Sequence, residues 1–345
     1  MKALVLESKA NFSIRDVEIP AIQSNQVLVK VAYVGICGSD LDRYFNGKVH
    51  NYPVILGHEF SGIITEVGNE VTDVEIGDRV AVAPLVPCEK CSSCESGNPA
   101  LCENYSFIGS REQGAMAEYV AVNAKNVLPL PDYITDQEAA LIEPLTVAIH
   151  GIEKLHIRAG DRAVIFGAGT IGMMSLLTLQ AKGAGEITII DLDQRKLEMA
   201  RELGASAIIN SSEVDLNTYF KENPRPKVVV ETAGVPQTQV QSLSVVEKMG
   251  QIVYIGTAKK EITFPANVFE RILRAELKVF GSWMSYSAPF PGFEWHAALQ
   301  YMKDGRIDVK PLIHEVNSLE VKEEPFKKMI DPENHSIKFL YDMTV

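Results

Sequence analysis

The sequence predicts an α/β fold in which a doubly wound parallel sheet is joined to a mostly antiparallel β domain. Residues 1 to about 145 contain short β-type runs separated by turn residues, which is typical of antiparallel sheets. From Asp161 onward, short apolar strands alternate with helical stretches, and this alternation is the pattern of a parallel sheet covered by helices. With 345 residues, the chain is long enough for two domains with separate cores.

The order of these patterns along the chain sets the expected domain limits. ALVL, VLVKVAYV, FSGIITEVG, DRVAVAP and AEYVAV are the expected strands of the first part, with no helical segment before Glu138. VIF, ITII, AIIN, VVVE and IVYIG are the strands of the parallel sheet, and the alternation stops after Gly281. We therefore expect the parallel-sheet domain at 148–283 and the β domain at 1–147 together with 284–345.

The first strand–helix–strand unit of the parallel sheet carries glycines at 167, 169 and 172. In this G-x-G-x-x-G spacing, Gly167 allows a tight turn, Gly169 admits a pyrophosphate to the backbone, and Gly172 lets helix and strand pack closely. Asp191 ends the next strand, where a carboxylate accepts hydrogen bonds from ribose hydroxyls and repels a 2′-phosphate. A glycine turn can serve packing alone, but this complete order predicts a Rossmann domain that binds NAD rather than NADP.

Charge and composition exclude several classes of protein. The net charge of −12 and the absence of a basic cluster argue against a nucleic-acid partner and against anionic membrane surfaces. No apolar run has transmembrane length, and the stretch MKALVLESKANF lacks the pattern of a signal peptide. We therefore expect a cytoplasmic protein. A phosphorylated substrate would require arginine or lysine placed at the site.

Four of the five cysteines, Cys88, Cys91, Cys94 and Cys102, have C-x2-C-x2-C-x7-C spacing. Thiolates at such spacing wrap one tetrahedral ion, and a closed shell of four sulfurs is typical of structural zinc. The residues between them are too polar to form a core, so a metal must order this lobe, residues 88–102. Disulfides are unusual in a reducing compartment, and nothing else in the sequence indicates electron transfer by an iron–sulfur cluster.

The fifth cysteine lies in GICGSD at Cys37, and two further segments carry residues of similar chemistry. His58 and Glu59 lie in LGHEFSG, and Glu143 lies in LIEPLT. Taken singly, each has an ordinary explanation. Cys37 could be a small buried hydrophobe, His58 a hydrogen-bonded loop residue, Glu143 a helix-end charge and Glu59 a surface acid.

Together, GICGSD, LGHEFSG, the four-cysteine lobe and IEPLTVAIH ahead of a dinucleotide fold resemble the zinc-containing medium-chain alcohol and polyol dehydrogenases, in their sorbitol-dehydrogenase-like branch. The resemblance covers essentially the whole chain and implies a GroES-like β domain. It makes Cys37, His58 and Glu143 catalytic zinc ligands, with Glu59 an additional or alternating one. Three ligands plus an open position also suit catalytic zinc physically, although manganese or cobalt could bind the same donors.

The resemblance further implies two zinc ions per subunit, a homodimer or homotetramer, and a proton relay that begins at Ser39. The alternative for Ser39 is that it caps a helix starting at Asp40. Asp42 stands where several alcohol dehydrogenases have the histidine that ends this relay. His50 could replace that histidine, or it could be an ordinary loop residue.

On the cofactor side, the resemblance places Ile171 beside the pyrophosphate and Lys196 near the adenosine. The nicotinamide contacts that it implies are Ile255, Gly256, Thr257, Ser282 and Trp283. Lys196 could instead be a solvated helix lysine, and Trp283 could pack in an interface.

The segments FIGSREQGAMAEY, ETAGVPQT and GSWMSYSAPFPGFEW resemble family members that act on sugar-alcohol phosphates. The implied reaction is NAD-dependent oxidation of galactitol 1-phosphate to tagatose 6-phosphate. D-arabitol phosphate and the free polyols sorbitol and iditol are alternative substrates. A non-catalytic nucleotide-binding protein is the alternative from a different class. Arg111 is the first candidate to bind the phosphate and Lys48 the second, although either could be a solvent-facing charge.

Overall fold

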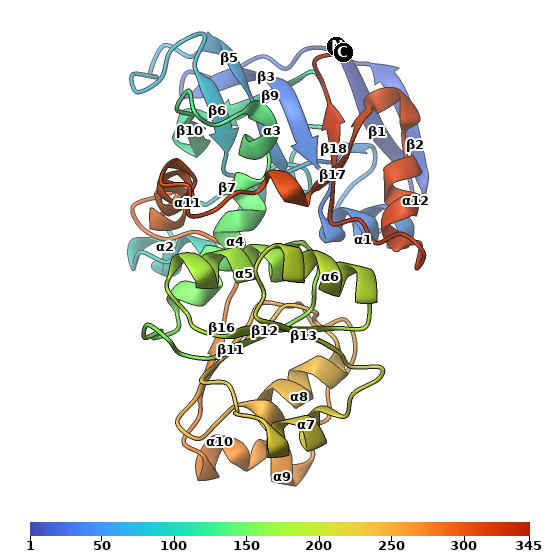
Figure 1. The fold of residues 1–345 in the computed structure, drawn as a ribbon. Helices are drawn as coiled ribbons and strands as arrows, with labels where there is room; N and C mark the ends of the chain where they lie inside the picture. The colour runs from blue at the N-terminus through green and yellow to red at the C-terminus, as the bar shows by residue number, and fades with distance from the viewer. The chain divides into compact units, whose positions relative to one another are not determined.

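The computed structural model describes residues 1–345, which form two compact units (Figure 1). Unit 1 comprises Met1–Glu143, Tyr286–Leu299 and Val309–Val345, and unit 2 comprises Pro144–Ser285 and Gln300–Asp308. The segment 300–308 therefore belongs to unit 2, whereas the sequence assigned all of 284–345 to the β domain. A helical pattern in the sequence shows which face of a helix is apolar but not which core that face joins.

Unit 1 is built from β-sheets, as predicted. The three-stranded sheet has the order β2-β1-β4, with β1 at Lys2–Ser8, β2 at Asn11–Asp16 and β4 at Val54–Ile55. The larger sheet has the order β10-β6-β5-β3-β18-β17, and β9 also pairs with β3. Its strands are β3 (Gln26–Gly35), β5 (Glu59–Val67), β6 (Arg79–Val82), β9 (Tyr119–Asn123), β10 (Val127–Pro129), β17 (Ile313–Ser318) and β18 (Lys338–Asp342). The strands β7 (Leu85–Val86) and β8 (Ser106–Phe107) form a separate hairpin. All pairs in this unit are antiparallel except β17 with β18.

The expectation of no helix before Glu138 was wrong, because α1 spans Gly38–Asn46. Its apolar residues Leu41, Tyr44 and Phe45 share one face and pack in the core of unit 1, but this stripe covers little more than one turn and is too short to identify a helix by periodicity. Cap residues define it instead. Cys37 is the N-cap, and Gly47 closes the helix with a φ of 70°, a left-handed conformation that glycine adopts readily.

The other helical segments of this part of the chain are short, apart from α11 and α12. They are α2 (Ser92–Glu95), α3 (Asp136–Ala139), α11 (Phe293–Lys303), α12 (Glu324–Ile330) and the 3₁₀ turns Pro99–Leu101, Ala124–Asn126, Lys310–Leu312 and Leu319–Val321. No helix of the chain combines the length and apolar character needed to span a membrane.

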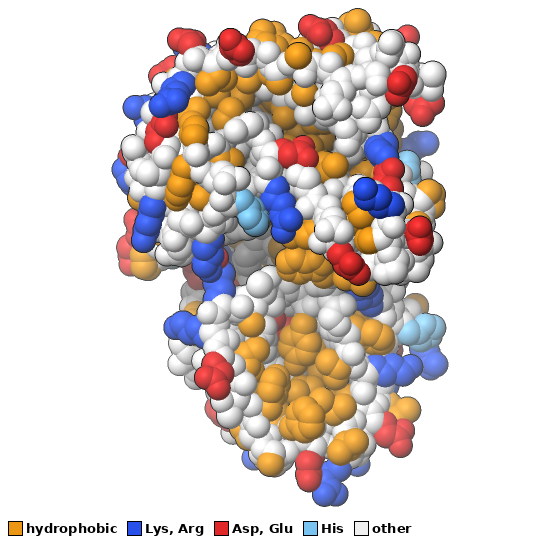
Figure 2. All heavy atoms as spheres, turned by 180° about the vertical axis from the view of Figure 1, so that it is seen from behind, with side chains coloured by type: hydrophobic (Ala, Val, Ile, Leu, Met, Phe, Trp, Pro, Cys, Tyr) orange, Lys and Arg blue, Asp and Glu red, His pale blue; other side chains and the backbone are white.

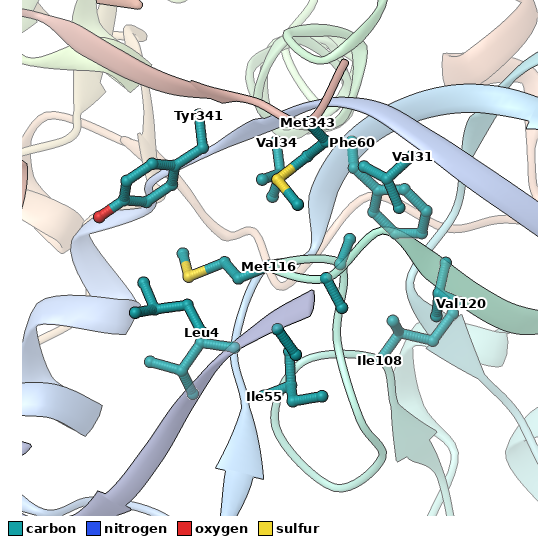
Figure 3. Packing of buried hydrophobic residues seen from close by; sticks show 14 of the residues in the cluster. Leu4, Val31, Val34, Ile55, Phe60, Ile108, Met116, Val120, Tyr341 and Met343 are labelled. Atoms are coloured by element: carbon teal, nitrogen blue, oxygen red, sulfur yellow. The ribbon is translucent and has the colours of Figure 1, made fainter. Parts of the chain in front are cut away.

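The core of unit 1 lies between its sheets and collects residues from distant parts of the chain (Figure 3). Leu4 of β1, Val34 of β3 and Phe60 of β5 are fully or almost fully buried there. Met116 and Tyr341 join them from a loop and from the last strand. This core fixes the ends of β3, β5 and β18, which carry residues of the candidate site.

Unit 2 contains one six-stranded sheet in the order β13-β12-β11-β14-β15-β16, with every neighbouring pair parallel. This strand order, 3-2-1-4-5-6, is that of a dinucleotide-binding fold and confirms the predicted fold class. The strands are β11 (Ala163–Phe166), β12 (Ile187–Asp191), β13 (Ala207–Asn210), β14 (Val228–Glu231), β15 (Gln251–Tyr254) and β16 (Lys278–Gly281).

Helices cover both faces of this sheet, with α5 and α6 on one side and α7 and α8 on the other (Figure 1). The helices in sequence order are α4 (Ile142–Glu153), α5 (Thr170–Ala181), α6 (Gln194–Glu202), α7 (Leu216–Glu222), α8 (Pro236–Val245), α9 (Ala266–Phe269) and α10 (Arg271–Arg274).

Candidate active site

The first element of the site is the N-terminus of α1, where Cys37 serves as the helix cap. Its Sγ accepts a hydrogen bond from the Ser39 N–H at 3.5 Å, and Asp40 Oδ2 accepts from the Cys37 N–H at 3.2 Å. The cap is thus Cys37, and the alternative that Ser39 caps this helix is wrong.

Three possible metal ligands converge at this point. The ligand atoms of Cys37, His58 and Glu59 all lie within 4.8 Å of one another. His58 and Glu59 are buried where β5 begins, directly after Gly57, whose φ of 96° makes the turn into the strand. One thiolate, one imidazole and one carboxylate form a donor set that suits zinc. The residues present therefore fit a catalytic metal.

Glu143 is the remaining predicted ligand and lies in the first turn of α4, 9% exposed. Burial raises the pKa of Glu143 to about 7; the charge of Glu59 adds to this rise, and the charges of His58 and Lys338 oppose it. Its carboxyl group therefore lies within electrostatic range of the converging ligands but is not one of the three that meet within 4.8 Å. A cation beside it would favour its ionised form.

Asp40 is a further residue of this site, beside His58, and it was not identified from the sequence. Its buried Oδ1 lies 3.5 Å from His58 Nδ1 and 2.7 Å from Arg43 Nη1. Burial alone would raise the pKa of Asp40, but the charges of His58 and Arg43 lower it to about 2. A carboxylate beside one imidazole nitrogen orients the ring and leaves the other nitrogen for a metal. Its position in the capping box, three residues after Cys37, is the signal that could have revealed it.

A second unpredicted residue, Lys338, lies beside Glu59. The Lys338 ammonium donates to Glu59 Oε2 at 2.7 Å and to the Ile36 carbonyl at 3.0 Å. Gly35 makes room for this pair, since a Cβ there would lie 2.6 Å from Glu59 Oε2. Glu59 and Lys338 are 279 positions apart in the chain, so no local pattern links them.

The residues predicted for the proton relay lie along α1. Ser39 is exposed, and its hydroxyl accepts a hydrogen bond from Arg43 Nη1 at 2.9 Å. Asp42 accepts from Asn46 and pairs with Lys48 at 3.4 Å. His50 is exposed in the loop after the helix. The partner that the structure gives to Ser39 is therefore Arg43, which sequence reasoning did not single out.

The loop after β8 flanks the other side of His58. The rings of Phe107 and His58 meet edge to face, with centroids 5.5 Å apart. Gly109 packs against the backbone of Gly57, where a Cβ would lie 2.5 Å from the carbonyl oxygen. Arg111 follows in the same loop, with its guanidinium 4.1 Å from the centre of the Tyr105 ring.

The four-cysteine lobe has the geometry of a tetrahedral sulfur site. The four Sγ atoms lie within 4.8 Å of one another, and Cys91 lies 3.6 Å from Cys94 and 3.9 Å from Cys102. A zinc–sulfur distance of about 2.3 Å corresponds to sulfur–sulfur distances of about 3.8 Å in a tetrahedron. All four cysteines are free thiols, so the disulfide alternative does not apply to this structure.

The pKa values of two thiols in this lobe also favour a bound cation. Backbone N–H groups of Cys94 and Glu103 lower the pKa of the Cys91 thiol to about 6. Burial and the neighbouring sulfurs of Cys91 and Cys102 raise the pKa of Cys94 to about 12. Four thiolates cannot accumulate in one place without positive charge between them, so the residues fit a structural zinc ion.

In unit 2, the three glycines of the loop after β11 have the backbone geometry that their spacing predicts. Gly167 has a φ of 99°, and a Cβ at Gly172 would lie 1.9 Å from the Gly167 carbonyl oxygen. Nothing lies within 4 Å of a Cβ built on Gly169, which is the N-cap of α5 and leaves the first-turn N–H groups without a side-chain cap. Such a helix end receives phosphate. Asp191 secures the loop, since its Oδ2 accepts from the Ala168 N–H at 2.6 Å.

The other predicted cofactor residues also lie in unit 2. Lys196, on α6, approaches Asp193 to 3.9 Å, and Ile171 is half-buried in the first turn of α5. Ile255, Gly256 and Thr257 follow β15, and the Ile255 side chain fills the space left by Gly151. Ser282 follows β16 with a buried hydroxyl that has no partner, and Trp283 is half-exposed. An unpartnered buried hydroxyl is consistent with a ligand contact.

Two family models match the chain. An alcohol dehydrogenase GroES-like domain matches residues 23–132, and a zinc-binding dehydrogenase matches residues 170–301. The chain is 39% identical to galactitol 1-phosphate 5-dehydrogenase of Escherichia coli (strain K12), over 93% of this chain and 94% of that protein. It is 34% identical to sorbitol dehydrogenase of Bacillus subtilis (strain 168), over 99% of this chain and 96% of that protein.

Solved structures extend this likeness over the whole fold. The crystal structure of galactitol-1-phosphate dehydrogenase from Escherichia coli has a TM-score of 0.94 at 37% identity, covering 99% of this chain and 100% of that chain. A zinc-binding dehydrogenase from Sinorhizobium meliloti 1021, bound to NADP, has a TM-score of 0.90 at 31% identity, covering 99% and 98%. An alcohol dehydrogenase from Escherichia coli CFT073, complexed with NADH, has a TM-score of 0.92 at 28% identity, covering 99% of both chains.

Proposed function

Because the chain belongs to the zinc-containing medium-chain alcohol and polyol dehydrogenase family, we propose that it oxidises a secondary alcohol of a sugar-alcohol phosphate with NAD. Galactitol 1-phosphate is the proposed substrate and tagatose 6-phosphate the product. The observation that carries this proposal is the convergence of Cys37, His58 and Glu59 within 4.8 Å, combined with the likeness to a galactitol 1-phosphate 5-dehydrogenase over 93% of the chain.

The chain's own residues would divide the work of this reaction. Cys37, His58 and Glu59 would hold the catalytic zinc, with Glu143 as a further ligand, and Cys88, Cys91, Cys94 and Cys102 would hold the structural one. When bound, catalytic zinc supplies a Lewis acid that lowers the pKa of the substrate hydroxyl. Ser39 would accept the proton from that hydroxyl, and the hydride would pass from the same carbon to the nicotinamide. The products are a ketone, NADH and one proton.

Recognition of the phosphate group requires positive charge near these ligands. Arg111 remains our first candidate because its loop contacts His58 through Phe107. The guanidinium lies over Tyr105 and donates to the Tyr105 carbonyl at 3.0 Å, which holds it in one orientation and leaves further N–H groups for a phosphate. Lys48 is the second candidate, and its 62% exposed side chain is paired with Asp42.

The test is NAD reduction at saturating cofactor with galactitol 1-phosphate, D-arabitol phosphate and free sorbitol side by side. We expect the highest kcat/KM with galactitol 1-phosphate, and we expect Arg111→Met to raise KM for the phosphate ester while leaving sorbitol oxidation unchanged. Lys328→Met is the matched control, because Lys328 is paired with Glu315 on the surface. Equal or faster turnover of sorbitol by the unaltered enzyme would contradict the proposal.

A free polyol is the second candidate substrate, and the 34% identity to a sorbitol dehydrogenase over 99% of the chain favours it. In that case the same zinc ligands would act, and Arg111 would be a surface charge. The substrate comparison distinguishes the two candidates, because Arg111→Met would then alter no kinetic constant for the preferred substrate.

We infer that NAD is preferred over NADP because of Asp191. Its carboxylate accepts from the N–H groups of Ala168, Leu192 and Asp193, so these bonds fix the carboxylate at the end of β12. A carboxylate at this place repels the 2′-phosphate of NADP. The test is fluorescence titration with NADH and NADPH in the absence of substrate. We expect tighter binding of NADH, and a smaller difference between the two in Asp191→Ser.

We also propose a homo-oligomer that pairs through the edge of the parallel sheet. β16 is the last strand of the sheet and pairs only with β15. Val279 on this strand is 40% exposed, and Leu273, Phe269 and Trp283 nearby in the chain are also exposed apolar residues. Hydrophobic side chains gather on one face of unit 2 in Figure 2. An unpaired apolar edge strand readily adds a second copy.

A further inference from the structure

We propose that Arg43 is a positioning residue, which orients the Ser39 hydroxyl so that the reaction's proton leaves to solvent directly. This inference rests on the proposed dehydrogenase function, but it concerns a residue to which neither the sequence motifs nor the relatives' names assign a role. It also explains how the proton can leave in a chain that has Asp42, and not a histidine, at the end of the relay.

The geometry of Arg43 is specific. A single nitrogen, Nη1, donates to Ser39 Oγ at 2.9 Å and to Asp40 Oδ1 at 2.7 Å. Asp40 is fully buried, and the Arg43 side chain is 14% exposed. One turn of α1 therefore connects the Ser39 hydroxyl to the carboxylate that lies beside His58. The buried Asp40 carboxylate holds the Arg43 guanidinium in place, and the guanidinium in turn holds the Ser39 hydroxyl.

This arrangement determines where the Ser39 proton can go. Arginine has five N–H donors and no acceptor, and it is not deprotonated in proteins. When Ser39 Oγ accepts from Arg43, the serine O–H must point away from the guanidinium, and Arg43 cannot receive the proton. Ser39 is exposed, so water is available as the acceptor.

The proton step then balances without a second side chain. Ser39 Oγ takes the proton from the substrate hydroxyl as the Ser39 O–H passes its own proton to a solvent water. The hydride leaves the same carbon for NAD, which is the only oxidant required. The positive charge of Arg43 also stabilises any negative charge that develops on Ser39 Oγ during this exchange.

The experiment is a double-mutant cycle on the holoenzyme with Ser39→Ala, Arg43→Met and the double variant. We expect Ser39→Ala to lower kcat by about 10²-fold or more, and Arg43→Met to lower kcat about tenfold with little change in KM. In the Ser39→Ala background, Arg43→Met should cost less than about twofold, because its effect passes through the hydroxyl. Arg43→Lys should restore most of the rate, since one ammonium can replace a single donating nitrogen.

A second readout does not depend on turnover. Trifluoroethanol, an alcohol that resists hydride loss, is titrated calorimetrically into the zinc-loaded protein with NAD. We expect Arg43→Met to weaken its binding about tenfold when Ser39 is present, and not in Ser39→Ala. Zinc content and circular dichroism identify a variant that has lost its metal or its fold, and Arg43→Gln and Arg43→Lys then complete the cycle.

The outcomes separate this inference from the proposed function. If the effects of Ser39→Ala and Arg43→Met are additive, both on kcat and on the binding of trifluoroethanol, Arg43 does not act through Ser39 and the inference is overturned. Absence of turnover with every polyol overturns the proposed function, while the trifluoroethanol cycle still decides the coupling. Arg15→Met is the matched control, because Arg15 also pairs with a carboxylate, Glu7, but lies on β2, and it should leave both readouts unchanged.

Discussion

Lys338 Nζ lies 2.7 Å from Glu59 Oε2, and both side chains are only 2% exposed. Strand β18 thus supplies the cation for a carboxylate that is itself a zinc-ligand candidate. Burial would lower the pKa of Lys338, but the charge of Glu59 raises it, so the pair is an ion pair. A buried ion pair of this kind contributes little to the free energy of unfolding while both partners remain. Removal of one partner is strongly destabilising, because it leaves the other charge buried and unpaired.

The first prediction concerns this pair. Lys338→Met should lower the free energy of unfolding by about 3–5 kcal/mol, because it leaves Glu59 buried with an unpaired charge. The double variant Glu59→Gln with Lys338→Met should recover a large part of that loss. Urea denaturation at pH 7 of the zinc-free protein measures both effects without a contribution from metal binding.

An exposed pair provides the control for this measurement. Lys2 and Glu320 are 61% and 64% exposed and lie 3.3 Å apart, so Lys2→Met should cost no more than about 1 kcal/mol. Equal losses in Lys2→Met and Lys338→Met would mean that burial does not decide the strength of these pairs.

The second prediction tests Asp40 as the support of His58. Asp40→Asn removes the charge beside His58 Nδ1 and should weaken catalytic zinc binding by about 10- to 100-fold. After dialysis against a mild chelator, metal analysis should give one zinc per chain instead of two, because the lobe keeps its ion. Asp42→Asn, two positions along the same helix, should keep both ions. Retention of two zinc ions by Asp40→Asn would rule out this supporting role.

The third prediction concerns the four-cysteine lobe. Cys94→Ala leaves three sulfurs, so the lobe should lose its ion and its order, since a polar loop without metal has no core. Limited proteolysis should then cleave within 88–102, which should resist cleavage in the unaltered protein. Cys37→Ser should leave the lobe intact, and α1 should persist because serine is a good helix cap. A lobe that resists protease without its ion would contradict this account.

The fourth prediction is a pH dependence of stability. Glu231 is fully buried at the end of β14, and its Oε1 accepts from the N–H groups of Ala233 and Gly234. Burial raises the pKa of Glu231 above 4.5, although these hydrogen bonds oppose the rise. The folded chain therefore holds this proton more tightly than the unfolded chain. Its contribution to stability is complete below pH 4.5 and is lost as the pH rises through the folded-state pKa.

Comparison with Glu231→Gln isolates the pH-dependent contribution of Glu231 to stability, because glutamine does not titrate. The stability of the unaltered protein relative to Glu231→Gln should fall as the pH rises above 4.5 and through the folded-state pKa of Glu231. Urea denaturation at a series of pH values provides the measurement. A difference in stability that is constant, or that grows with pH, would show that the pKa of Glu231 is not raised in the folded state.

The fifth prediction concerns self-association. Val279→Lys places a charge on the exposed edge strand β16 and should shift the protein toward monomers. Ile76→Lys is the control, since Ile76 is 62% exposed in unit 1. Analytical ultracentrifugation measures both. An unchanged sedimentation coefficient for Val279→Lys would place the interface elsewhere or exclude it.

Much of this site could be predicted because its residues lie in short motifs. Gly167 and Gly172 follow from a fixed spacing whose geometric reason is visible in a Cβ that would lie 1.9 Å from a carbonyl oxygen. The four lobe cysteines follow from ligand spacing in the same way. Cys37 and His58 were identified through the resemblance, and their convergence in the structure supports that assignment.

The residues that escaped prediction act across the fold or through a single helix turn. Lys338 meets Glu59 only because β18 lies beside β3 in the sheet. Arg43 was not singled out in the sequence, and only the capping-box spacing could have indicated Asp40; the structure shows that they contact Ser39 and His58. The packing of 300–308 onto unit 2 also has no signature in the periodicity of α11.

The interleaving of the two units along the chain has a consequence for synthesis on the ribosome. All six strands of unit 2 have been translated by residue 281, but the larger sheet of unit 1 still lacks β17 and β18 at that point. Domains generally fold as they emerge, so unit 2 is expected to fold before the unit that the ribosome began first. Lys338 lies in β18, which follows all of unit 2 in the chain, and until it emerges, Glu59 has no ammonium beside it. A nascent chain stalled before that residue is therefore expected to contain a folded unit 2 and an incomplete unit 1.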